Sequence, residues 1–163
     1  MQKLTYPNKL TIIRGLPGSG KSTLGRRLAE ESGSIFIEPD MFCVNKGIYR
    51  YTPNRYEAAV RQSLDFLRKA NCDVVYADVL PTRADVMRVF NSYFWCQTDK
   101  AVEHEFRLIA LRISVEEALA KNIHHVNEYD LRRMASSWEN CIGEERIALS
   151  EYLFYEPLDH PTV

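Results

Sequence analysis

The residues with the clearest chemical meaning form one glycine-rich run near the start of the chain. Residues 15–22 read Gly-Leu-Pro-Gly-Ser-Gly-Lys-Ser, a complete G-x-x-x-x-G-K-[ST] pattern. In such a loop successive backbone N–H groups converge on a phosphate, the lysine reaches the β- and γ-phosphates, and the serine hydroxyl binds Mg²⁺. The pattern predicts a site for ATP or GTP with magnesium, made by Gly15, Leu16, Pro17, Gly18, Ser19, Gly20, Lys21, Ser22 and Thr23, with Lys21 also catalytic and Ser22 on the metal.

The elements expected on either side of this run are the ones that the pattern requires. The apolar residues 10–13 predict a buried strand. A helix is expected to begin near Lys21 and to end at Gly33. A glycine-rich turn without a ligand is the alternative, and the strand before the run and the helix after it argue against that alternative.

Two acidic residues follow the next expected strands. A second strand is expected from the apolar run 35–37 and to end at Asp40, and Asp78 ends the apolar run 73–78. Open α/β sheets bind their ligands at the carboxyl ends of strands, which is where both acids are expected. Asp40 is a candidate to accept a proton from a substrate hydroxyl in line with the γ-phosphate, and Asp78 to hold a magnesium-bound water or orient the acceptor. A helix cap or a turn is the alternative role for each.

The remaining chain alternates short apolar runs with helical patterns, which is typical of βαβ units. We expect a three-layer α/β P-loop domain with a mostly parallel sheet of four or five strands and helices on both faces. It would take up residues 1–163, with a short lid at about 121–127 and a C-terminal helix and tail at about 128–163. Further helices are expected to begin at Thr52, Thr82, Ser114 and about Asn127. A fourth strand is expected at 106–111, and an irregular loop rich in aromatic residues at 42–51.

Composition narrows the class of protein. The 163 residues are 45% hydrophobic, which is enough for a folded core, and the net charge of −1 argues against a protein whose whole surface binds nucleic acid. The four cysteines lie far apart, without the spacing of a zinc site or a disulfide scaffold. No export signal or membrane-spanning run is evident, so we expect a cytoplasmic protein without a membrane partner.

Several segments together resemble a known family. They are 14–24, 38–42, 47–53, 77–78, 121–126 and 131–134. In order and spacing they are similar to the kinase domain of phage-type polynucleotide 5′-hydroxyl kinases and the related AAA- and zeta-toxin-like ATP-binding proteins. The resemblance implies that Asp40 acts on an attacking 5′-hydroxyl and that a basic lid closes over the phosphates. In the lid, this chain offers Lys121, His124 and His125.

The chain also departs from the family pattern at substrate-contacting positions. Cys43 stands where the kinases have an arginine, and Val79 and Leu80 follow Asp78 where polar residues are usual. Arg50 could replace the missing phosphate contact, with Tyr49 or Tyr51 stacking on a base. An exposed aromatic loop is the alternative for these residues.

Three functions are therefore considered. The first is transfer of the γ-phosphate of ATP to a hydroxyl, above all to the 5′-hydroxyl of a polynucleotide. The second is a kinase for a small hydroxyl compound or a modified nucleotide. The replacement of the family's arginine and polar substrate contacts by Cys43, Val79 and Leu80 would permit such an acceptor. The third is an ATP-binding module with little catalytic activity of its own.

Overall fold

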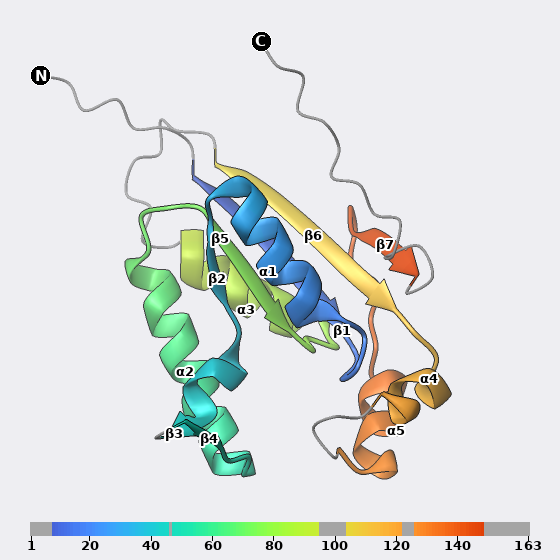
Figure 1. Ribbon diagram of the computed structural model, residues 1–163. Coiled ribbons are helices and arrows are strands. Elements are labelled where there is room, and N and C mark those ends of the chain that lie inside the picture. Colours follow the sequence, from blue (N-terminus) through green and yellow to red (C-terminus); the bar gives the residue numbers. More distant parts are fainter. Residues whose placement is uncertain (1–7, 46, 95–103, 122–125, 149–163) are drawn as a thin grey trace, which may run out of the picture.

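A five-stranded parallel sheet organises the protein (Figure 1). The computed structural model describes residues 8–45, 47–94, 104–121 and 126–148. The strand order is β2-β5-β1-β6-β7, and each neighbouring pair is parallel. The expected mostly parallel sheet of four or five strands is confirmed. The strands are β1 (Lys9–Gly15), β2 (Ile35–Ile37), β5 (Val74–Asp78), β6 (Glu105–Arg112) and β7 (Glu145–Ala148).

Helices cover both faces of the sheet and give the expected three layers (Figure 1). Helix α1 (Lys21–Ser32) packs on one face, where Leu24 and Leu28 meet Ile13 and Ile109. Helices α2 (Pro53–Lys69) and α3 (Arg83–Phe94) pack on the opposite face. All five residues of β5 are buried, because this strand lies inside the sheet and is covered on both sides.

The helix boundaries follow from capping residues that the sequence shows. The Thr52 side chain accepts a hydrogen bond from the N–H of Arg55 at 3.2 Å. Ser114 forms the expected capping box with Glu117 at the start of α4 (Val115–Ala120). Asn127 caps α5 (Glu128–Ser136). Each cap satisfies an N–H group that the first helical turn would otherwise leave without a partner.

The segment expected to be an aromatic loop is more regular than predicted. It forms the 3-10 helix η1 (Pro39–Cys43) and a small antiparallel hairpin of β3 (Val44–Asn45) and β4 (Ile48–Tyr49). The expected end of the second strand at Asp40 is corrected as well, since β2 ends at Ile37 and Asp40 lies in η1. Pro39 explains this, because its fixed φ favours the first turn of a helix over a longer strand.

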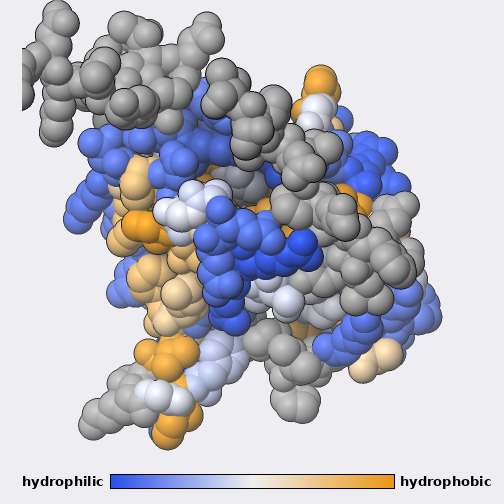
Figure 2. All heavy atoms as spheres, turned by 45° about the horizontal axis from the view of Figure 1, so that its top comes forward, coloured by the Kyte–Doolittle hydropathy of each residue, from blue (hydrophilic) through white to orange (hydrophobic). Residues whose placement is uncertain are grey.

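Exposed apolar side chains gather on the side of the molecule that η1, α2 and the hairpin form. Figure 2 shows orange and pale orange atoms down this side to the hairpin. Among them Met41, Val44 and Ile48 are each close to half exposed or more. Side chains of the hairpin belong to none of the three buried clusters of the described residues. The hairpin is thus held by its own pairing and by η1 rather than by the core.

A buried arginine ties the C-terminal segment to the central strand. The guanidinium of Arg14 in β1 is fully buried beneath the ring of Trp138, 4.0 Å from its centroid. It donates to the carbonyl oxygens of Pro81 and Glu139 and lies 3.7 Å from the carboxylate of Glu144. Burial lowers the pKa of Arg14. Trp138 lies just beyond the end of α5 at Ser136.

Two features bear on the expected cellular setting. No helix within the described part of the chain is both long and apolar enough to cross a bilayer. Cys43, Cys72 and Cys141 have free thiols, and the remaining cysteine, Cys96, lies outside the described residues.

Candidate active site

The glycine-rich loop joins β1 to α1 and leads into the uncapped N-terminus of this helix. One N–H of the loop, that of Ser19, is bonded to the carbonyl oxygen of Leu16 at 3.1 Å. Gly18 and Gly20 have φ values of 81° and 90°, a left-handed conformation that glycine adopts without strain. Gly20 is the N-cap of α1, and no side chain caps this helix. The N-terminus of a 12-residue helix therefore faces the loop with uncapped N–H groups, an arrangement suited to an anion such as phosphate.

Contacts with α4 explain why Gly18 has no side chain. A Cβ atom at this position would lie 3.2 Å from the carbonyl oxygen of Ala118 and 3.3 Å from the Cβ atom of Lys121. Leu16 packs with Ala118 and Leu131 in a small buried cluster shared with α4 and α5. The loop and the helices that follow β6 are thus in direct contact, and Lys121 lies beside the loop.

Lys21 is the cation at the base of the site. Its Nζ donates a hydrogen bond to the carbonyl oxygen of Leu16 at 3.0 Å. Burial lowers the pKa of this ammonium, and the negative charges of Asp78, Asp40 and Glu38 oppose that shift. The lysine and the acids are therefore close enough to interact electrostatically.

Asp78 is buried at the end of β5, beside Arg14 of the neighbouring strand. Its Oδ1 accepts hydrogen bonds from the hydroxyl of Tyr56 and from the N–H of Val79. Burial raises the pKa of the Asp78 carboxyl, whereas these two hydrogen bonds and the charge of Lys21 lower it. The carboxyl is thus fixed in place near the lysine.

Asp40 reaches the site from the first turn of η1. Its Oδ1 accepts a hydrogen bond from the hydroxyl of Tyr49 at 3.0 Å. Within the described residues, this carboxylate accepts no hydrogen bond from a backbone N–H, although Asp40 lies in the first turn of η1. Glu38, at the start of η1, pairs with Arg26 of α1 at 2.9 Å and links this turn to the helix after the loop.

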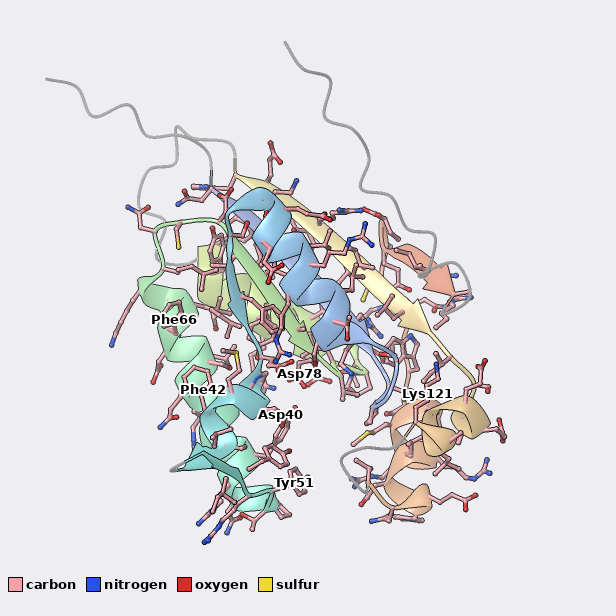
Figure 3. The ribbon with its side chains drawn as sticks, in the orientation of Figure 1. Asp40, Phe42, Tyr51, Phe66, Asp78 and Lys121 are labelled. Carbon is pink, nitrogen blue, oxygen red and sulfur yellow. The ribbon has the colours of Figure 1, made fainter. Side chains whose placement is uncertain are left out.

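These groups share one cavity of about 910 Å³. Because β2, β5 and β1 are parallel neighbours, their carboxyl ends bring Asp40, Asp78 and the glycine-rich loop to one edge of the sheet. Figure 3 shows Asp40, Asp78 and Tyr51 on one side of the opening, with Lys121 across from them. The lining includes Pro17, Gly18, Gly20, Lys21, Ser22, Thr23, Asp40, Tyr49, Tyr51, Tyr56, Asp78, Arg88, Lys121, Asp130 and Arg133.

Residues 10–130 match the family model described as an AAA domain. The chain belongs to this AAA domain family. Its fold is that of P-loop kinases, as the solved structures similar to it show.

Three solved structures illustrate the range of proteins with this fold. A gluconokinase from Sinorhizobium meliloti 1021 is 17% identical with a TM-score of 0.62, and the match covers 89% of this chain and 84% of that one. A chain of the Pnkp1/Rnl/Hen1 RNA repair complex is 17% identical with a TM-score of 0.63, covering 83% of this chain and 45% of that one. Shikimate kinase from Acinetobacter baumannii is 17% identical with a TM-score of 0.51, covering 81% and 76%.

The AAA domain brings most of the predicted site residues together. Within the loop, Gly15, Leu16 and Ser19 do not line the cavity and instead support the turn. Arg50 is exposed and does not line the cavity either, whereas Tyr51 does. Of the predicted lid residues, Lys121 lines the cavity, and His124 and His125 lie outside the described residues.

Sequence reasoning missed part of the cavity wall. The ring of Tyr56 in α2 packs against the core, and its hydroxyl reaches Asp78. The sequence signal for this role was a tyrosine, with its polar hydroxyl, among aliphatic residues near the N-terminal end of the helix. Arg88 of α3, which was not expected there, also lines the cavity and is paired with Asp85 of its own helix. Arg133 of α5, for which contact with ATP and a solvated helix face were both open, lines the cavity and is paired with Asp130.

The AAA domain has groups that suit a nucleoside triphosphate with magnesium. The uncapped start of α1 and the Lys21 ammonium suit phosphate. The Ser22 hydroxyl and the Asp78 carboxyl, which both line the cavity, are oxygen donors of the kind that Mg²⁺ prefers. Within the described residues no group of three histidine, cysteine or acidic side chains forms a metal cluster.

Proposed function

We propose that this AAA domain is an ATP-dependent kinase whose preferred acceptor is the 5′-hydroxyl of a polynucleotide. The observation that carries the proposal is that Lys21, at the start of α1, and the carboxylates of Asp40 and Asp78 line one cavity. A phosphate-binding cation and a carboxylate without a capping role are what transfer of a phosphoryl group to a hydroxyl requires.

Each side chain has a role in this proposal. ATP with Mg²⁺ supplies the phosphoryl group and the charge that neutralises the phosphates. The N–H groups of the loop and Lys21 hold the phosphates, the Ser22 hydroxyl holds the metal, and Asp78 holds it through a water or orients the acceptor. Asp40 accepts the proton of the acceptor hydroxyl as its oxygen bonds to the γ-phosphorus, and the bond to the β,γ-bridging oxygen breaks to release ADP.

The proposal extends to the parts of the chain that close the cavity. Residues 1–163 form one kinase domain, and a lid at about 121–127 covers the phosphates. The proposal is supported by the backbone of Lys121, which lies next to Gly18, and by the Lys121 side chain, which lines the cavity. A cation on the transferring group can contribute about three to five powers of ten in rate where it acts as an arginine finger.

The acceptor half of the cavity supports a nucleic-acid end. Tyr49, Tyr51 and Tyr56 line it, and the rings of Tyr51 and Tyr56 lie 5.9 Å apart. Exposed tyrosine rings are stacking surfaces for bases, and Arg88 and Arg133 offer positive charge to backbone phosphates. The match to a chain of an RNA repair complex is in keeping with this acceptor.

A small hydroxyl compound is the second candidate acceptor. Gluconokinase and shikimate kinase have the same fold over most of their length. In addition, the buried, apolar Leu80 lines the cavity where the polynucleotide kinases have polar residues. An apolar wall of this kind suits a compact substrate.

A substrate screen separates these functions. The purified protein is incubated with [γ-³²P]ATP and Mg²⁺, together with 5′-hydroxyl RNA or DNA oligonucleotides, nucleosides, or sugars and other small hydroxyl compounds. Labelled oligonucleotide ends are expected, and labelling of small acceptors alone would replace the first function with the second. ATP binding without transfer to any acceptor would favour an ATP-binding module.

A further inference from the structure

Each of the two carboxylates at the cavity is held by a tyrosine hydroxyl. Tyr49 donates to Oδ1 of Asp40 at 3.0 Å, and Tyr56 donates to Oδ1 of Asp78. Among the described residues, the only other hydrogen bond to either carboxylate comes from the N–H of Val79, and it also goes to Oδ1 of Asp78. Both carboxylates therefore have one oxygen engaged and keep Oδ2 for other partners.

The two tyrosines come from a single short segment, residues 48–56. Tyr49 lies on β4, which among the described strands pairs with β3 alone. Tyr56 lies in the first turns of α2, where its N–H bonds to the carbonyl oxygen of Thr52 at 2.9 Å and its ring packs against the core. One end of the segment is thus anchored in the core and the other in the exposed hairpin. Tyr51 lies between them in sequence, and Figure 3 shows it at the lower end of this side of the opening, with Asp40 above it and Asp78 above Asp40.

A hydrogen bond to one carboxylate oxygen restricts the orientation of the carboxylate, and this orientation matters for phosphoryl transfer. The terminal torsion of an aspartate side chain is broad and roughly two-fold, so an unrestrained carboxylate presents either oxygen over a range of angles. A general base must lie within hydrogen-bond reach of the proton that it accepts, and a misplacement of about 1 Å can cost about 10²-fold in rate. A donor on Oδ1 fixes where Oδ2 points.

We propose that Tyr49 and Tyr56 are positioning residues, which orient Asp40 toward the acceptor hydroxyl and Asp78 toward the Lys21 and metal side of the cavity. For Tyr49, this inference rests on the proposed function. For Tyr56, it can be tested independently of that function. Neither tyrosine contacts the reacting atoms in this account. Each acts through its carboxylate.

Phenylalanine variants test the proposal, because they remove only the hydroxyl. Tyr49→Phe is expected to lower kcat for a 5′-hydroxyl oligonucleotide about 10- to 100-fold, with KM for ATP within about two-fold. Tyr93→Phe is the matched control, since Tyr93 is buried and its hydroxyl donates to the carbonyl oxygen of Cys72 at 2.7 Å, near the opposite ends of the strands. This control is expected to lower Tm and leave the kinetics unchanged.

For Tyr56, a double-mutant cycle measures whether the tyrosine acts through the aspartate. Binding of Mg²⁺ with a non-hydrolysable ATP analogue is titrated by calorimetry for wild type, Tyr56→Phe, Asp78→Ala and the double variant. Tyr56→Phe is expected to weaken binding about 5- to 10-fold in the wild-type background and to have no effect when Asp78 is already alanine. A purely structural role would give the same loss in both backgrounds.

The outcomes separate this inference from the proposed function. An additive cycle for Tyr56, kinetics of Tyr49→Phe equal to those of Tyr93→Phe, or an increased kcat for Tyr49→Phe would overturn the inference. A change confined to KM for the acceptor would also overturn it, because the tyrosine hydroxyls, and not only the rings, would then bind the acceptor itself. If wild type phosphorylates no acceptor, the proposed function fails, and the binding cycle still decides the role of Tyr56.

Discussion

Replacing Gly18 with alanine should separate the phosphate-binding role of the loop from ordinary backbone strain. Gly18 has a φ of 81°, and an L-residue in this left-handed region costs about 1–2 kcal/mol. In addition, the new Cβ atom would lie 3.2–3.3 Å from atoms of Ala118 and Lys121. Both distances are shorter than ordinary van der Waals contact, so the loop or the end of α4 must shift by a few tenths of an ångström.

Gly33→Ala is the matched control for this substitution. Gly33 has a φ of 68°, and a Cβ atom there would meet nothing within 4 Å. For a chain of this length, about 1 kcal/mol of destabilisation corresponds to about 2–4 °C in Tm. Both variants are therefore expected to lose at least this much thermal stability without ligand, and only Gly18→Ala should also move the N–H groups that face phosphate.

Thermal unfolding with and without ATP and Mg²⁺ gives the result. Ligand at about 100 times its Kd stabilises the folded state by about 2.7 kcal/mol, and each ten-fold loss of affinity removes about 1.4 kcal/mol of this at fixed ligand concentration. We expect Gly18→Ala to lose ten-fold or more in affinity and Gly33→Ala to keep the wild-type increase in Tm. An ATP-induced increase as large in Gly18→Ala as in Gly33→Ala would refute the assignment of the loop to phosphate binding.

Three further predictions concern charged groups. Lys21→Ala should abolish most of the ATP-induced increase in Tm, and an unchanged increase would remove Lys21 from the site. Arg14→Met should lower the free energy of unfolding in urea by about 1–3 kcal/mol or more, because the carbonyl oxygens of Pro81 and Glu139 lose their buried donor. The buried Glu144 would then keep only its pair with Arg146, so adding Glu144→Gln should restore part of the loss. Arg107 holds the pKa of Glu145 below its usual 4.5 by hydrogen bonding, so the pair stabilises the fold above pH 4.5 and less as pH falls through the lowered pKa. Glu145→Gln should lower the free energy of unfolding by less than about 1 kcal/mol at pH 7 and by almost nothing at pH 2. An equal loss at both pH values would contradict this.

The sequence predicted those parts of the fold that depend on local patterns. The strand before the glycine-rich loop, the end of α1 at Gly33 and the cap at Thr52 are set by residues next to one another in the chain, and all three are confirmed. The hairpin at 44–49 was not predicted, because its two-residue strands are too short for an alternating pattern. The buried position of Arg14 was not predicted either, since its partners lie more than 60 residues away in sequence.

The candidate site was predictable to a similar degree. Asp40 and Asp78 could be placed at one edge of the sheet, because the carboxyl ends of parallel strands meet there. Their tyrosine partners could not, since a hydrogen bond from Tyr56 to Asp78 depends on how α2 packs across the sheet. The side chain of Arg50, expected at the acceptor, is exposed outside the cavity, while Arg88 and Arg133 of later helices line it.

The central claim is that ATP bound by the loop presents its γ-phosphate to a hydroxyl activated by Asp40. It is tested most directly by single-turnover transfer from [γ-³²P]ATP to the acceptor found in the substrate screen, for wild type and Asp40→Asn, with ATP affinity measured on the same samples. The account predicts that Asp40→Asn binds ATP within about two-fold of wild type and transfers phosphate at least about 10²-fold more slowly. Equal rates of transfer by the two proteins would contradict it.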